Sequence, residues 1–402
     1  MKKIKKYIFP LTMLLSLILA TITGIFAPDS FLKTINPLGD LFVNLMFTLV
    51  VPLVFFTITS SIANLNKKAK LTTLLSKTFL IFIITSAISA IVMLIPLLFI
   101  SPGKGVNIDI ESTKNENLNI LTQIVEAISV KDFSELFSKS HMLALIIFSI
   151  LFGIALRYID KENKLGKTLE ILSNTMLRIV KMILYYAPIG VFAYFANLIN
   201  SYGEEIISSY LTTLILYVVV SIIYFFVFYT LYAYIAKGKN GVKTFYKNIF
   251  PSFTCSLATQ SSLASLPTNL ETAKEMNIDS SVSKVAMPLG ATVHMEGSAI
   301  GSILKIFFLF SVFSIDVSSP LTYVSALIIA IASGVVMSGI PGGGLIGEML
   351  IVSLYGFPPA AFALIATIGW LIDAPATMLN VCGDVPSCML IEKFVYKNKT
   401  KE

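Results

Sequence analysis

Long runs of apolar residues fill most of the first 240 positions of this chain. They fall near residues 7–27, 36–64, 74–101, 140–159, 174–199 and 208–236. Because about 20 apolar residues in a helix cross the hydrocarbon core of a bilayer, each run predicts a transmembrane helix. The segment 119–138 is shorter and amphipathic, which favours a partial or peripheral helix.

Beyond residue 240 the apolar pieces are interrupted at their centres. Neither half of pieces 243–275 and 320–355 is long enough to cross a bilayer, so we predict two re-entrant helical hairpins. Their Ser-rich and Gly-rich tips are Ser256–Pro267 and Ser338–Gly344. An interrupted helix is predicted after each hairpin, at 280–316 and 357–393, the first broken at His294–Ser298. Two hairpins in corresponding positions indicate an inverted repeat, an arrangement that puts ligand sites of secondary transporters at mid-membrane.

Composition supports an all-α polytopic membrane protein. Of 402 residues, 55% are hydrophobic and 13% are charged, whereas soluble domains average about 25% charged residues. The first run, 7–27, is longer than the apolar core of a signal peptide, so we interpret it as a retained helix. Three cysteines and two histidines show no spacing typical of disulfides or zinc sites, and no covalently bound cofactor is expected.

The net charge of +7 is distributed in alternate loops. Basic residues cluster at 2–6, 67–70, 157–167, 237–247 and 393–401, while the intervening loops are acidic or mixed. This alternation follows the positive-inside rule and argues against nucleic acid as a partner. We expect a multi-pass protein of a bacterial inner membrane with both termini in the cytoplasm.

A polar stripe crosses the last apolar segment. Asp373, Thr377, Asn380 and Asp384 are spaced four, three and four residues apart, so they share one face of a helix. Ionisable side chains at membrane depth are costly and are usually functional. The structural alternative is a stripe that only joins neighbouring helices by hydrogen bonds.

Four short motifs, in their order and spacing, resemble the dicarboxylate/amino acid:cation symporter family. They are Val51–Phe56, Ala187–Gly190, Pro288–Thr292 and Asn380–Asp384. The resemblance implies a glutamate-transporter-like fold with eight transmembrane helices and two hairpins, a homotrimer and an elevator mechanism. It also implies a scaffold at 1–239, whose third and sixth helices move with the transport domain, and a transport core at 240–395.

The resemblance also assigns ligands residue by residue, with His294–Ser298 in the place of the family's Asn-Met-Asp-Gly-Thr motif. Implied substrate ligands are Ser261, Ser262, Ser298, Gly339, Asp373, Thr377 and Asn380. Implied sodium ligands are Gly290, Thr292, His294, Met295, Glu296, Thr85, Ser86, Asn380 and Asp384. Carboxylate and carbonyl oxygens in this set suit a hard cation such as Na⁺.

One departure from the family concerns the substrate. The positions where relatives carry an arginine for an acidic side chain are Ala376 and Gln260, and no arginine follows Arg178. Without a guanidinium to bind a second carboxylate, we predict a sodium-coupled symporter of serine, threonine or alanine. The alternative is a sodium- or proton-coupled symporter of dicarboxylates or acidic amino acids with Lys305 as anion partner. A structural ion pair between Lys305 and Glu348 is the competing role for that lysine.

A second departure concerns cations. Where relatives hold a third sodium ion, Phe82 and His294 replace oxygen ligands, and imidazole nitrogen suits a hard cation poorly. His294 beside Glu296 suggests that a proton replaces one sodium ion, with a neutral space-filling histidine as the alternative.

Enzyme interpretations fit the sequence less well. An intramembrane aspartyl protease needs two acids on different helices, whereas Asp373 and Asp384 lie on one predicted helix, about 16 Å apart along its axis. We therefore expect no enzymatic activity. A passive channel or membrane sensor stays open until ion-driven uptake is measured.

Overall fold

Helices account for every regular element that the computed structural model assigns. The structure describes residues 8–64, 69–106, 129–138, 141–315, 317–336 and 344–396, and no strand occurs within these ranges. The predicted all-α class is therefore confirmed for the described part of the chain.

The first half consists of long helices that match most of the predicted runs. They are α2 (Ile8–Phe26), α3 (Asp29–Ala63), α4 (Ala69–Leu97), α6 (Phe133–Leu136), α7 (Met142–Ile159), α8 (Lys164–Ile183), α9 (Ala187–Ile223), the π-helix η2 (Tyr224–Phe228) and α10 (Tyr229–Asn248). The predicted span 174–199 falls on a corner, because α8 and the first part of α9 are bent by 59°. Of the predicted segment 119–138, residues 119–128 lie outside the described ranges and α6 covers only four residues.

The second half consists of helices of 10 to 17 residues, followed by one helix of 37 residues, α17. They are α11 (Phe250–Thr259), α12 (Ser262–Glu275), α13 (Ser280–Val293), α14 (Glu296–Val312), α15 (Pro320–Val336), α16 (Gly344–Leu354) and α17 (Ala360–Tyr396). Gln260 turns the chain between α11 and α12 in a left-handed conformation (φ 48°). Ser261 then caps α12 by accepting a hydrogen bond from the Ala264 amide (3.2 Å). The predicted hairpin 243–275 thus has its tip at Gln260 and Ser261.

Two predictions about interrupted helices have different outcomes. A break separates α13 from α14, but it covers only His294 and Met295, and Glu296–Ser298 already belong to α14. The predicted interruption in the last helix is wrong, since α17 runs without a break from Ala360 to Tyr396. Pro375 and Pro386 lie within this helix and do not end it, because tertiary packing overrides their local penalty.

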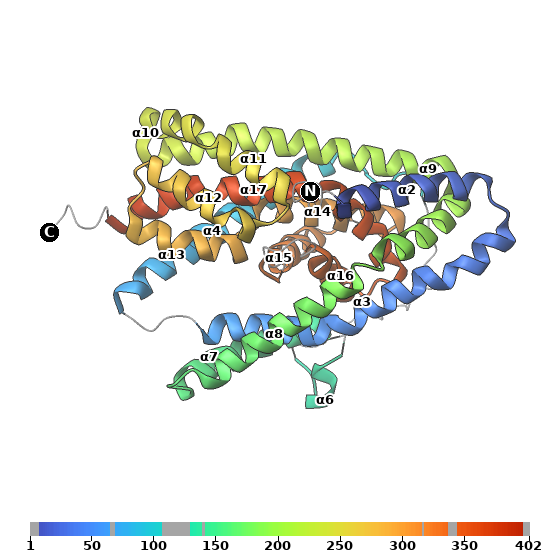
Figure 1. Ribbon diagram of the computed structural model, residues 1–402, viewed down its shortest axis with the longest axis horizontal. Coiled ribbons are helices and arrows are strands. Elements are labelled where there is room, and N and C mark those ends of the chain that lie inside the picture. Colours follow the sequence, from blue (N-terminus) through green and yellow to red (C-terminus); the bar gives the residue numbers. More distant parts are fainter. Residues whose placement is uncertain are drawn as a thin grey trace.

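The late helices occupy the centre of the molecule. Figure 1 shows α14, α15 and α17 between α9 and α10 on one side and α3, α7 and α8 on the other. The helix α17 packs against α9, α10, α11, α13, α14 and α16, and α14 packs against α4 and α15. Nearly all of α14 is buried, so its few polar residues lie deep in the protein.

Several helices are long and apolar enough to cross a membrane. In the described ranges these are Asp29–Ser60, Leu74–Leu97, Glu205–Asn248, Ser280–Val312 and Ala360–Val395, with the bent pair α8–α9 as a sixth candidate. Large apolar side chains such as Phe26 (79% exposed) and Phe99 (84% exposed) lie on the surface, as expected for contact with lipid. The chain is therefore a multi-pass membrane protein, while the count of eight spans stays a prediction.

Candidate functional site

The break between α13 and α14 is stabilised from the neighbouring helix α17. Asn380 Oδ1 accepts hydrogen bonds from the backbone amides of Gly297 (2.8 Å) and Ser298 (3.3 Å), and its Nδ2 donates to Ser298 Oγ (3.1 Å). The first amides of a helix have no partner within that helix, so Asn380 acts as a cap supplied from outside α14. The positive end of the α14 dipole therefore lies against the polar stripe of α17.

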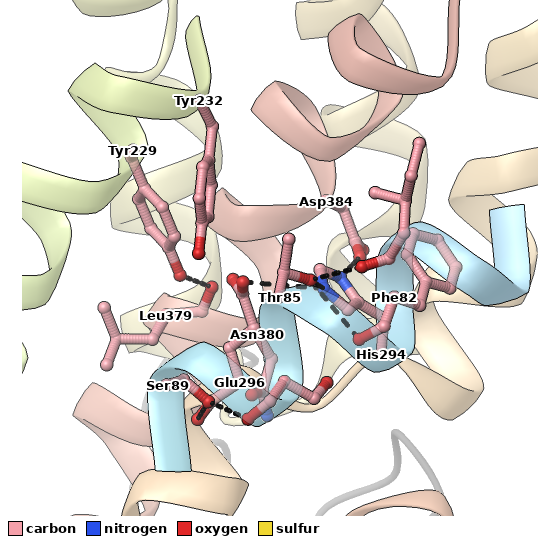
Figure 2. A network of polar contacts seen from close by, with 12 residues as sticks. Phe82, Thr85, Ser89, Tyr229, Tyr232, His294, Glu296, Leu379, Asn380 and Asp384 are labelled. Atoms are coloured by element: carbon pink, nitrogen blue, oxygen red, sulfur yellow. Dashed lines mark hydrogen bonds and ion pairs between the residues drawn. The ribbon is translucent and has the colours of Figure 1, made fainter. Parts of the chain in front are cut away.

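His294 lies at this break with polar partners on both ring nitrogens. Its Nδ1 is 2.9 Å from Asp384 Oδ1 and its Nε2 is 2.8 Å from Thr85 Oγ1 (Figure 2). Phe82 stacks on the imidazole with ring centroids 4.2 Å apart, and Glu296 Oε1 lies 3.6 Å from Nε2. The imidazole thus occupies the space between two fully buried carboxylates.

Two glycines make room for these carboxylates. A Cβ at Gly290 would overlap the Asp384 carboxylate, and a Cβ at Gly383 would overlap Glu296 Oε2. Glu296 Oε2 has no hydrogen-bond partner, whereas Oε1 accepts from the Tyr224 hydroxyl (2.9 Å). A buried carboxylate with one unsatisfied oxygen is costly, which marks this place as suited to a positive charge.

A group of tyrosines around Glu296 was not anticipated from the sequence. Tyr224 donates to Glu296 and lies 3.0 Å from the Tyr232 hydroxyl, while Tyr229 donates to the Leu379 carbonyl (2.7 Å; Figure 2). The π-helix Tyr224–Phe228 brings Tyr224 and Tyr229, five residues apart, to the same face. The predicted span 208–236 contains six tyrosines, which is a visible signal. The five-residue step from Tyr224 to Tyr229 does not fit an α-helical face, so the sequence did not predict that these two meet.

The predicted sodium ligands fall into two groups. Thr85, Gly290, His294, Glu296 and Asp384 surround the imidazole, and Asn380 lies beside them through its bonds to α14. The remaining three, Ser86, Thr292 and Met295, line a mainly apolar cavity of about 680 Å³. That cavity lies between α3, α7 and α8 on one side and α4, α13, α14 and α15 on the other.

The predicted substrate ligands meet only in part. Ser298 and Asp373 line a small cavity of about 30 Å³, together with Ala376, Lys305 and Glu348. Thr377 is buried on the same helix as Asp373, and Asn380 bonds to Ser298. Ser261 and Ser262 are buried at the tip of the first hairpin and are not among the residues that line this cavity. Gly339 lies outside the described residues.

Lys305 and Glu348 form the expected ion pair. Lys305 Nζ lies 2.5 Å from Glu348 Oε1, and the two side chains are 4% and 1% exposed. The pair joins α14 to α16 and borders the small cavity. Lys305 was expected either to bind a substrate carboxylate or to pair with Glu348. The two roles involve the same site, because the ion pair lines the cavity that Asp373 also lines.

A broken helix, a helix pair that folds back at Gln260 and Ser261, and buried charges at the break are the arrangement that secondary transporters use. The sodium:dicarboxylate symporter family matches residues 9–394, and the chain belongs to this family. The family resemblance and the absence of an enzymatic function are thereby confirmed.

Relatives with established names share about a quarter of their residues with this chain. The proton/glutamate-aspartate symporter of Bacillus subtilis is 25% identical, with 99% of this chain and 97% of the relative covered. The proton/sodium-glutamate symport protein of Geobacillus stearothermophilus is 27% identical (94% and 93% covered). The C4-dicarboxylate transport protein of Rhodospirillum rubrum is 26% identical (95% and 87% covered).

These names correct the substrate prediction. The expectation of a small neutral amino acid is wrong, because the relatives are named for glutamate, aspartate and C4-dicarboxylates. The prediction used the missing arginine at Ala376 and Gln260 as its main argument. It gave too little weight to Lys305, which supplies a cation to the same cavity from a different helix.

Proposed function

We propose that this protein is a cation-coupled symporter of acidic amino acids, with C4-dicarboxylates as the second candidate substrate. The observation that carries the proposal is the cavity where Lys305 and Asp373 meet beside Ser298 at the start of α14. A basic and an acidic group that line one cavity match a ligand that bears both a carboxylate and an ammonium group.

Charge complementarity gives each part of the ligand a place. Asp373 pairs with the α-ammonium, and the amino end of α14 with Ser298 receives the α-carboxylate. Lys305 receives the side-chain carboxylate in the absence of an arginine. A dicarboxylate has no ammonium group to pair with Asp373, so its negative charge would lie beside the negative Asp373 carboxylate. We therefore rank an acidic amino acid first.

The coupling cation belongs at the buried carboxylates Asp384 and Glu296. Asn380 lies one helical turn before Asp384 and caps α14 next to Ser298, so it connects this place with the substrate cavity. A cation bound beside the break between α13 and α14 would therefore also fix the position of the Gly297 and Ser298 amides, which we expect to bind the substrate carboxylate. The relatives are named for protons or for protons and sodium, and both ions are candidates here.

The proposed mechanism is an elevator movement of a transport domain within a homotrimer. The cavity of about 680 Å³ between the early helices α3, α7 and α8 and the later helices supports this division, because it lies along the boundary between the two groups of helices. The third predicted helix corresponds to α4, and the sixth, 208–236, to the end of α9, η2 and the start of α10. The packing of α4 on α14 and α17, and of α9 and α10 on α17, supports the expectation that these two helices move with the transport core.

The decisive experiment is uptake into proteoliposomes. Purified protein is reconstituted, and uptake of labelled aspartate, succinate and serine is measured with an inward sodium gradient, a pH gradient or neither. We expect aspartate uptake that exceeds serine uptake and requires one of the two gradients. Equal uptake without any gradient would indicate a passive channel, and faster serine uptake would refute the assignment of Lys305.

A further inference from the structure

The ion pair between Lys305 and Glu348 differs from an ordinary structural pair in its position. Both residues line the cavity of about 30 Å³ that also contains Asp373 and Ser298. A cavity of this size holds about one water molecule, so a four-carbon diacid has no room while Glu348 occupies it. Glu348 Oε2 has no hydrogen-bond partner, so only one of its two oxygens contributes to the pair.

The helix α17 is shaped to admit the Glu348 side chain. A Cβ at Gly369 would overlap Glu348 Oε1 and would lie 2.9 Å from its carboxyl carbon. Gly369 lies one helical turn before Asp373, so Glu348 reaches α17 at the same face that presents the proposed ammonium partner. The Glu348 carboxylate is therefore paired with Lys305 at the proposed substrate cavity.

We propose that Glu348 is an internal substitute for the substrate carboxylate, and that substrate binding exchanges one carboxylate for another on Lys305. This inference rests on the proposed function, because it requires an acidic substrate. The exchange keeps Lys305 paired in both states, which avoids the penalty of a buried ammonium without a partner. Glu348 thus competes with the substrate and sets the affinity and the selectivity for a second carboxylate.

The test compares ligand binding to wild type and Glu348→Gln. Dissociation constants of aspartate and of its neutral isostere asparagine are measured calorimetrically on purified protein in nanodiscs, at saturating sodium and fixed pH. Removal of the competing carboxylate should tighten aspartate binding at least about tenfold, equivalent to ~1.4 kcal/mol. Asparagine binding should change less than about twofold, because it brings no second carboxylate to Lys305.

Glu392→Gln is the matched control. It breaks a different ion pair, which joins Glu392, near the end of α17 and away from the cavity, to Lys237 (2.7 Å). Its aspartate affinity should equal that of wild type. If Glu348→Gln does not fold, Glu348→Asp retains the charge on a shorter side chain and should also tighten aspartate binding.

The outcomes separate the two proposals. If wild type binds aspartate and the Glu348 variants bind it equally or more weakly, the pair is structural and the exchange is refuted, while the proposed function stands. If neither wild type nor the variants bind aspartate, glutamate or succinate, the proposed function fails and the exchange fails with it. Equal tightening of aspartate and asparagine would also overturn the exchange, since it would show a general opening of the cavity.

Discussion

Gly290→Ala tests whether the contact between α13 and α17 controls cation binding. An added Cβ would lie 2.6 Å from Asp384 Cγ and 3.0 Å from its Oδ2. Carbon atoms in ordinary contact are about 3.5–4.0 Å apart, so the carboxylate must move by about 1 Å. A shift of that size disturbs the hydrogen bond of 2.9 Å between His294 Nδ1 and Asp384 Oδ1 and moves the carboxylate within the proposed cation site.

The energetic consequence follows from the type of bond. Asp384 is also the proposed cation ligand, and a contact to a charged group contributes about 1.5–3 kcal/mol. A displaced Asp384 carboxylate should therefore lower cation affinity by about 10- to 150-fold. The fold itself should persist, because alanine is favoured over glycine in a helix by about 1 kcal/mol and offsets part of the strain. Impaired coupling in a folded protein is the expected phenotype.

The assay measures uptake of labelled aspartate into proteoliposomes as a function of sodium concentration and, separately, of external pH. Gly334→Ala is the control, because its added Cβ would lie 3.5 Å from Met295 Cβ, an ordinary contact. The control should keep the midpoints of both titrations. If Gly290→Ala also keeps both midpoints within about twofold, the pairing of Asp384 with the break does not control coupling, and the reasoning is refuted.

Three further variants test other parts of the site. Asp373→Asn should reduce aspartate affinity by about 10- to 150-fold, because the substrate ammonium group loses its charged partner. The melting temperature should stay within a few degrees of wild type. Unchanged affinity in calorimetry would show that Asp373 does not bind the substrate. His294→Asn replaces the imidazole with an amide oxygen, which is a better ligand for Na⁺, so the half-saturating sodium concentration for uptake should fall about tenfold. An unchanged value would show that sodium does not bind at this position. Tyr224→Phe removes the donor to Glu296 and should lower the free energy of unfolding by about 1–3 kcal/mol in thermal denaturation, and equal stability would mean that water replaces the hydroxyl.

The sequence by itself determined the class of fold and much of the site. Apolar runs long enough to cross a bilayer indicated membrane helices, and Ser- or Gly-rich interruptions in the later runs indicated folded-back helix pairs. Both predictions were possible because they depend only on local composition and length. The stripe Asp373, Thr377, Asn380 and Asp384 was predictable as one face of α17, since helical periodicity places side chains without any tertiary information.

Only the tertiary structure decided which distant groups meet. The pairs Thr85–His294 and Tyr224–Glu296 join residues 209 and 72 positions apart. The ion pair Lys305–Glu348 was one of two roles left open for Lys305, and the structure showed that it forms, across 43 positions. Periodicity in a single helix carries no information about the partner across an interface, so the position of Lys305 in the cavity of Asp373 could not be read from its spacing to Ser298. Packing also kept α17 continuous through Pro375 and Pro386, where local rules favour a break, because its neighbours bury it on several sides.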